Sequence, residues 1–275
     1  MPPFLSYADE APEISTRIPL VLVHGHPFDR TMWRPQLADF ATARRVIAPD
    51  LRGYGASPVS PGTVPLSRHA QDIAELLDFL GVDTFVLAGL SMGGQIAMEC
   101  LSHWGERVRG LVLADTFPDP ETAEGRRGRN AMADRLLDEG MRGYADEVLE
   151  KMVAPYTNPD VKAHVHRMMT STAPEGAAAA LRGRAERPDY RPVLARATAP
   201  ALVVVGADDT YTPVADAETM HALLPDSELH IVEGAAHLPN LERPEEFNEV
   251  LGRFLTRVDA RAELRTTTGT DTTTK

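Results

Sequence analysis

Short runs of consecutive apolar residues alternate along the chain with longer stretches of helical periodicity. The runs are rich in valine, leucine and isoleucine, and most are apolar on successive residues rather than on alternate ones. This pattern is typical of strands in a parallel sheet that is covered on both faces. The predicted strands are Leu20–Val23, Val46–Ala48, Phe85–Ala88, Leu111–Ala114, Leu202–Val205 and Leu229–Val232.

Helical stretches separate the predicted strands. Between residues 73 and 80, isoleucine and leucine recur at the i, i+3, i+4, i+7 spacing, and Gly81 supplies a C-terminal stop. The same spacing recurs from residue 247 to residue 258. Because strands that alternate with helices imply right-handed crossovers, we predict an α/β fold with a doubly wound, mostly parallel sheet. The segment around residues 4 to 7 is a candidate antiparallel strand at the sheet edge.

The alternation stops between about residues 117 and 198, where the sequence predicts helices only. We interpret this stretch as a helical lid inserted between two strands. The chain ends in a polar stretch, TTTGTDTTTK, that lacks apolar anchors. The predicted organisation is therefore a core of residues 1–116 and 199–258, a lid of residues 117–198 and a disordered tail of residues 259–275.

Composition narrows the function classes. The 275 residues carry a formal net charge of -12, which disfavours nucleic acids and anionic membranes as partners because both require a basic face. No apolar run reaches the roughly 18 residues that span a bilayer. The N-terminus lacks the basic and apolar regions of a signal peptide, and the single Cys100 excludes an internal disulfide. We therefore expect a cytoplasmic protein whose partner is a small molecule; the pattern specifies no oligomeric state.

A candidate nucleophile, Ser91, follows the predicted strand Phe85–Ala88. The sequence Gly-Leu-Ser-Met-Gly-Gly at residues 89–94 matches G-x-S-x-G between a strand and a helix-compatible stretch. Side chains at Gly89 and Gly93 would crowd the sharp turn that lifts the serine above the sheet. The alternative is a glycine-rich turn with an incidental serine, and the flanking strand and helix favour the nucleophile.

A serine needs a base and an acid to become a nucleophile. His237 follows the last predicted strand, and Asp209 follows the strand before it, which is the chain order that this arrangement requires. Asp208 is a close rival for the acid, but the Gly-x-x-Asp-x-x-x-Pro spacing favours Asp209. Asp115 is a second rival, and we interpret it instead as a carboxylate that caps a loop.

A loop after Leu20–Val23 is the candidate oxyanion hole. Gly25 allows close approach of the backbone, so that the N–H of His26 can act together with the N–H of Met92. Two histidine pairs could instead suggest a metal, but neither sits in a fuller ligand set such as H-E-x-x-H, so we predict no metal site. These pairs are His24 with His26 and His164 with His166.

Taken in order, these motifs resemble the α/β-hydrolase family over about residues 4 to 258. They are His24–Pro27, Asp50–Gly55, Gly89–Gly94, Gly206–Pro213 and Gly234–Phe247. The segments at residues 89–94 and 236–247 most resemble the branch of small serine esterases and 3-oxoadipate enol-lactonases, which also includes cofactor-free haloperoxidases. The resemblance implies hydrolysis of an ester or lactone with no cofactor. Family members that are haloalkane dehalogenases or epoxide hydrolases carry aspartate where this chain has Ser91.

Substrate contacts are predicted at Phe28 and Phe117. Three arginines, Arg126, Arg127 and Arg129, could meet a substrate carboxylate, although a solvated helix face is the favoured interpretation. Methionines in the lid are interpreted mainly as core. The same triad could instead serve perhydrolysis with halide oxidation, C–C bond hydrolysis or acyl transfer, and the fold could serve as a ligand receptor without catalysis.

Overall fold

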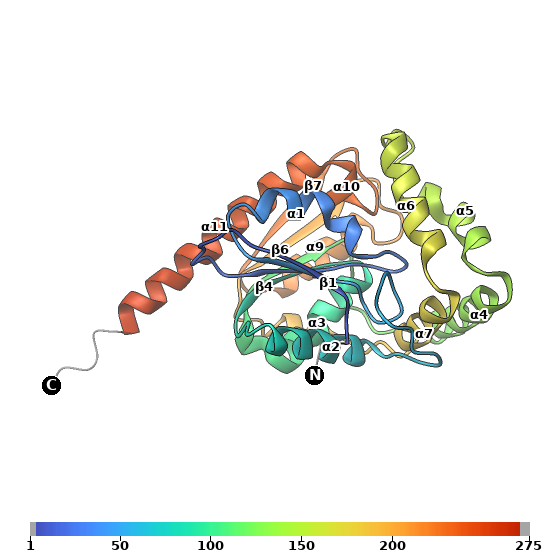
Figure 1. Ribbon diagram of the computed structural model, residues 1–275, viewed down its shortest axis with the longest axis horizontal. Coiled ribbons are helices and arrows are strands. Elements are labelled where there is room, and N and C mark those ends of the chain that lie inside the picture. Colours follow the sequence, from blue (N-terminus) through green and yellow to red (C-terminus); the bar gives the residue numbers. More distant parts are fainter. Residues whose placement is uncertain (1–3, 270–275) are drawn as a thin grey trace.

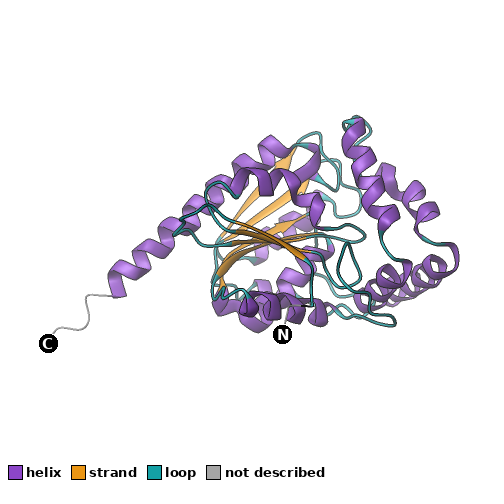
Figure 2. Cartoon of the chain, in the orientation of Figure 1, coloured by secondary structure: helices purple, strands orange, loops and turns teal. Residues whose placement is uncertain are grey.

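A computed structural model of the protein describes residues 4–269. Its centre is one seven-stranded sheet with the order β1-β3-β2-β4-β5-β6-β7, and helices cover both faces (Figures 1 and 2). All neighbouring strands are parallel except β1, which pairs antiparallel with β3 at the edge. The predicted doubly wound, mostly parallel sheet is confirmed. The strands are β1 (Tyr7–Glu10), β2 (Leu20–Val23), β3 (Val46–Pro49), β4 (Phe85–Leu90), β5 (Val108–Ala114), β6 (Ala201–Gly206) and β7 (Ser227–Val232).

Successive residues of the central strands feed two separate hydrophobic cores. In β2, Val21 and Val23 belong to one core, while Leu20 and Leu22 belong to the other. Strands β2, β3, β4 and β6 are buried at every position because each has a helical layer above and below. The edge strand β7 is only partly buried, which explains its more polar sequence.

The helices of the core divide between the two faces. In the view of Figure 1, α2 and α3 lie on one side of the sheet, whereas α1 and α11 lie on the other. These core helices are η1 (Arg30–Trp33), α1 (Arg34–Phe40), α2 (Leu66–Phe79), α3 (Met92–Trp104), η2 (Gly105–Arg107), α9 (Val214–Leu223), α10 (Pro239–Glu242) and α11 (Pro244–Gly269).

Five helices are inserted between β5 and β6, and we call them the inserted helices. In Figure 1, α4 to α7 stand together beside the sheet rather than on its faces. They are α4 (Ala123–Glu139), α5 (Met141–Met152), α6 (Pro159–Ser171), α7 (Pro174–Arg184) and α8 (Arg191–Leu194).

Helix α7 lies directly against two loops of the core. A Cβ on Gly176 would lie 2.1 Å from the carbonyl oxygen of Gly53, and one on Gly183 would lie 1.8 Å from that of Val64. The backbone N–H of Val64 also donates to the carbonyl of Ala179 at 3.0 Å. Because only glycine permits such approach, α7 contacts the core through its backbone at these two positions.

The predicted disordered tail is wrong for residues 259–269, which continue helix α11. Alanine, arginine, glutamate and leucine at positions 260–264 are all good helix formers, and an existing helix gains one hydrogen bond for each added residue. Arg261 also pairs with Asp226, at the end of α9's connection to β7. The remaining part of the predicted tail, residues 270–275, lies outside the described residues. Within residues 4–269, no helix combines the length and hydrophobicity needed to cross a bilayer.

Candidate active site

Ser91 occupies a tight turn between β4 and α3. Its backbone has φ 56° and ψ -118°, a region that non-glycine residues rarely adopt and that concentrates at functional sites. The turn is held by the Ser91 N–H, which donates to the Ala114 carbonyl at 2.9 Å. A Cβ on Gly93 would lie 2.1 Å from the carbonyl oxygen of Val23, which explains why glycine is needed after the serine.

Two backbone N–H groups near Ser91 are free to receive a negative charge. Met92 is the first residue of α3, so its N–H has no partner within the helix. The N–H of His26 likewise donates to no other backbone group in the described chain. A side chain on Gly25 would approach the Ser91 Cβ to 3.1 Å, so the loop that carries His26 passes beside the serine. This arrangement is what the predicted oxyanion hole requires.

Asp209 and His237 are joined as predicted for an acid and a base. The Asp209 Oδ2 lies 2.7 Å from the His237 Nδ1, and both side chains are buried. Burial alone would raise the pKa of Asp209, but His237 and the donors from Thr212 and Tyr211 outweigh it and lower that pKa. The rival Asp208 is exposed and accepts a hydrogen bond from Tyr156 instead.

Asp115, the second rival, lies beside this pair. A carboxylate oxygen of Asp115, a carboxylate oxygen of Asp209 and a ring nitrogen of His237 all lie within 4.8 Å of one another. The Asp115 Oδ1 accepts from the Gly206 N–H at 2.9 Å, while its Oδ2 is buried and has no hydrogen-bond partner within residues 4–269. Burial, and then the nearby Asp209 carboxylate, raise the pKa of Asp115 well above its usual range. A protonated Asp115 is therefore suited to face the charged Asp209.

Glu242 connects the loop of His237 to the inserted helices. Its Oε1 accepts from the backbone N–H groups of Ala236 at 3.0 Å and Leu238 at 3.2 Å, one on each side of His237. Its Oε2 accepts from the Ala154 N–H at 2.7 Å and the Thr157 hydroxyl at 2.6 Å, both after α5. A single buried carboxylate thus fixes two segments that are far apart in the sequence.

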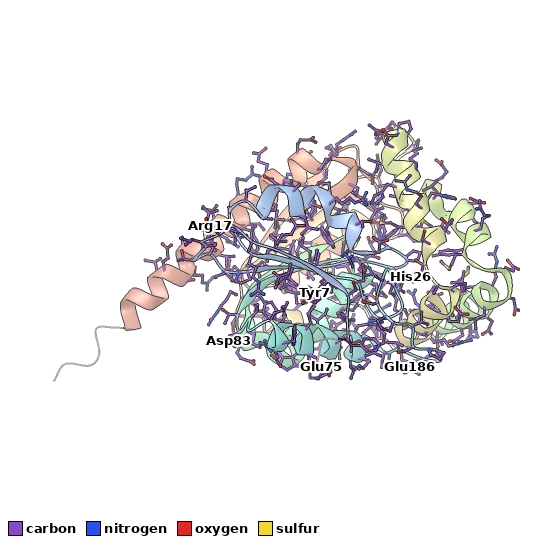
Figure 3. All side chains as sticks on the ribbon, in the orientation of Figure 1. Tyr7, Arg17, His26, Glu75, Asp83 and Glu186 are labelled. Carbon is purple, nitrogen blue, oxygen red and sulfur yellow. The ribbon has the colours of Figure 1, made fainter. Side chains whose placement is uncertain are left out.

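Ser91 and His237 open into one cavity of about 180 Å³. The Ser91 hydroxyl makes no hydrogen bond to His237 in the described chain, a contact that commonly tightens only when substrate binds. His26 also lines the cavity, and Figure 3 shows it where the sheet faces the inserted helices. The other lining residues are Gln95, Phe117, Arg129, Tyr144, Met152, Leu181, Arg184, Tyr211 and Thr212.

The two predicted substrate contacts are placed differently. Phe117 lines the cavity, beneath the guanidinium of Arg187 at 4.5 Å from the ring centroid. Phe28 is not among the lining residues; its side chain is fully buried and belongs to the same hydrophobic core as Met32 and Trp33. Its ring lies by the loop next to Ser91, since a Cβ on Gly25 would be 3.5 Å from the Phe28 ring and 3.1 Å from the Ser91 Cβ. A substrate contact through Phe28 stays a prediction.

The three arginines of α4 that were considered as substrate contacts also differ in their positions. Arg126 and Arg127 are exposed, as expected for a solvated helix face, whereas Arg129 reaches the cavity. Six further lining residues were not anticipated from the sequence: Gln95, Tyr144, Leu181, Arg184, Tyr211 and Thr212. Leu181 and Arg184 lie on α7, whose residues 176–181 are small or apolar and buried on every face. That uniform pattern signals an enclosed helix, and hence an enclosed arginine at its end.

The histidine pairs considered as metal ligands have other partners. Both ring nitrogens of His24 are used, since Nδ1 bonds to the Gly25 carbonyl at 2.8 Å and Nε2 accepts from the Leu51 N–H at 2.9 Å. His164 bonds to Thr31, and His166 bonds to Asp146 at 2.6 Å. His26 Nδ1 lies 2.8 Å from the Tyr54 hydroxyl oxygen. Each of the four histidines therefore has a partner in its local surroundings.

A larger hollow of about 560 Å³ lies at the other end of the sheet. It is bordered by Val108 and Pro200, at the amino ends of β5 and β6. Ligands of open parallel sheets bind at the carboxyl ends of the strands, where Ser91 and His237 lie. The smaller cavity is therefore the candidate active site.

Comparisons with known proteins agree with this geometry. The model of the alpha/beta hydrolase family matches residues 20–250. In sequence, the chain is 29% identical to 3-oxoadipate enol-lactonase 2 from Acinetobacter baylyi over 230 residues, covering 82% of this chain and 84% of that protein.

Solved structures of an esterase and an enol-lactonase are also similar to this chain. A thermophilic esterase from Thermogutta terrifontis, solved with malate bound, has a TM-score of 0.89 at 36% identity and covers 93% of this chain and 94% of that chain. The enol-lactonase from Burkholderia xenovorans LB400 has a TM-score of 0.84 at 27% identity and covers 92% of this chain and 96% of that chain.

Proposed function

Because the chain belongs to the alpha/beta hydrolase family, we propose that it hydrolyses a small carboxylic ester or lactone through an acyl-enzyme on Ser91. The observation that carries this proposal is the convergence of a strained serine, a buried histidine and a free pair of N–H groups on one cavity. The esterase and the lactonase that resemble this chain both cleave an acyl–oxygen bond, which supports the same reaction class here.

The charge of Asp209 determines which ring nitrogen of His237 carries a proton. The lowered pKa of Asp209 keeps it a carboxylate at neutral pH, so it can only accept a hydrogen bond from His237 Nδ1. The Nε2 of neutral His237 then carries the lone pair that removes the Ser91 proton as Oγ attacks the carbonyl carbon. Asp209 stabilises the imidazolium that forms.

The remaining steps use the same groups. The N–H groups of His26 and Met92 stabilise the oxyanion of the tetrahedral intermediate, and loss of one such donor typically costs about 3 kcal/mol. His237 returns its proton to the leaving alcohol, and then activates water to hydrolyse the acyl-enzyme. No step requires a metal or organic cofactor.

We also propose that the inserted helices act as a lid that shapes the pocket. Five of the lining residues belong to them, and the cavity is small, equivalent to about six water molecules at the volume of the liquid. A compact acyl group therefore suits the pocket better than a long chain. The five residues are Arg129, Tyr144, Met152, Leu181 and Arg184.

Covalent labelling tests the proposal. A fluorophosphonate probe is expected to label Ser91, and Ser91→Ala is expected to lower kcat for a small ester such as p-nitrophenyl acetate on the order of 10⁶-fold. Ser102→Ala, at an exposed serine on the same helix, is the matched control and should keep full activity. Ester hydrolysis that persists in Ser91→Ala, or labelling at another residue, would refute the assignment.

A further inference from the structure

The candidate active site differs in charge from the rest of the molecule. The chain has a net charge of -12, yet two of the described residues that line the cavity are arginines and none is acidic. Asp209, the nearest catalytic carboxylate, is already occupied by His237 and by donors from its own loop. The cavity therefore presents positive charge beside the nucleophile.

Arg184 is the source of charge that has no counter-ion. It is 8% exposed, at the end of α7, and its Nε donates to the Gln95 Oε1 at 3.2 Å. Among the side chains that the structure describes, no carboxylate pairs with it. Burial, and then repulsion from Arg129 and Arg187, lower the pKa of Arg184 well below its usual range, because these surroundings disfavour a cation.

The two neighbouring arginines, unlike Arg184, have a carboxylate that balances their charge. Arg129 pairs with Glu121, and Arg187 lies 3.4 Å from the same carboxylate. Arg187 also donates to the Asp119 carbonyl at 2.8 Å. A buried cation without such partners is energetically costly.

Gln95 supplies a second unused donor at the same place. Its Oε1 accepts from Arg184, and its Nε2 is buried with no hydrogen-bond partner among the described residues. Gln95 is fully buried, lies in the first turns of α3, four residues after Ser91, and lines the cavity. An orphaned amide donor beside an unpaired guanidinium is a donor set that matches a carboxylate.

We propose that Arg184 and Gln95 form a subsite for a carboxylate group of the substrate, so that the enzyme acts on small esters or lactones that carry a negative charge near the scissile bond. This inference rests on the proposed hydrolase function. A carboxylate here would give Arg184 its missing counter-ion and satisfy the Gln95 Nε2. It would also orient the carbonyl toward Ser91 by fixing the other end of the substrate in a small cavity.

Matched substrate pairs test the subsite. Monomethyl succinate and monomethyl glutarate are compared with their carboxamide analogues, with hydrolysis followed by pH-stat. The wild-type enzyme should prefer at least one of the acids over its neutral analogue in kcat/KM by on the order of 10- to 100-fold, the range of a hydrogen bond to a charged group. Arg184→Gln should remove this preference, and Arg184→Lys should restore part of it.

Arg126→Gln is the matched control, because Arg126 is an exposed arginine on the inserted helices. It should leave the preference for the acid unchanged. Equal losses for acid and carboxamide in Arg184→Gln would mean that Arg184 has only a structural role and would overturn the proposal. A wild-type enzyme that prefers both carboxamides would overturn it as well.

A binding measurement separates this inference from the proposed reaction. Glutarate binding to Ser91→Ala is measured by isothermal titration calorimetry, and compared with the Ser91→Ala/Arg184→Gln double variant. Binding that depends on Arg184 supports the subsite even if wild-type protein hydrolyses none of the esters, in which case the proposed reaction fails alone. Absence of glutarate and succinate binding, in a protein that hydrolyses neutral esters, refutes the subsite alone.

Discussion

Replacing Glu242 by glutamine would test whether one carboxylate holds the base loop and the inserted helices together. Glutamine has nearly the same shape, but one of its two terminal atoms is a donor. Each oxygen of Glu242 accepts two hydrogen bonds, two from the sides of His237 and two from the segment after α5. Whichever way the amide turns, two donors lose their acceptor and meet another donor.

The size of the effect follows from those four contacts. Hydrogen bonds to charged groups contribute about 1.5–3 kcal/mol each, so losing two in a residue that is 7% exposed should cost about 3–6 kcal/mol. For a chain of this size, that lowers Tm by roughly 6–24 °C. Because His237 lies between two of the donors, kcat should also fall, on the order of 10-fold or more.

Thermal unfolding and ester hydrolysis measure the two effects on the same preparation. Glu246→Gln is the control, because Glu246 is also a glutamate on this part of the chain but meets His230 at the surface. That exposed pair should contribute less than about 1 kcal/mol. A Tm for Glu242→Gln within a degree of the wild-type value would show that the carboxylate does not bridge the two segments.

Further substitutions address the acid and the turn. Asp209→Asn should lower kcat on the order of 10⁴-fold by disturbing the His237 tautomer, whereas Asp208→Asn should leave kcat near wild type; steady-state kinetics would contradict the assignment if the order were reversed. Asp115 has a raised pKa in the folded protein, so its contribution to stability is fully present below the unfolded pKa near 4 and is lost as pH rises toward the folded pKa. Asp115→Asn should therefore flatten the dependence of Tm on pH above pH 4, and an unchanged Tm profile would show that Asp115 titrates normally. Gly93→Ala should yield unstable or inactive protein, since its methyl group would meet the Val23 carbonyl at 2.1 Å; circular dichroism with a wild-type melting curve would refute this steric argument.

The sheet and the proposed catalytic residues could be predicted from the sequence because both depend on local signals. Buried strands such as β2 are continuous apolar runs, and the turn at Ser91 requires glycine at fixed positions. Asp209 and His237 then follow from their positions after successive strands. The choice between Asp208 and Asp209 depended on one residue of spacing, and only Asp209 contacts His237.

The pocket was less accessible because its walls come from long-range packing. Phe28 is close to the oxyanion loop in sequence, yet its ring enters the core. Arg184 lies more than ninety residues from Ser91 in the sequence. It is in the last turn of an alanine-rich helix, where basic residues are common in any protein. Helix α11 continues beyond residue 258 because residues 260–264 favour helix without needing an apolar face.

The backbone contacts of α7 limit how freely the inserted helices can be exchanged between related enzymes. Gly176 meets the loop of Gly53, and Gly183 meets Val64, so both partners of each contact must be compatible. A transplanted helix with alanine at either position would be displaced from the core, and its arginine would move with it. Changes of specificity in this scaffold should therefore arise more readily by substitution within the existing helices than by replacement of the whole insertion.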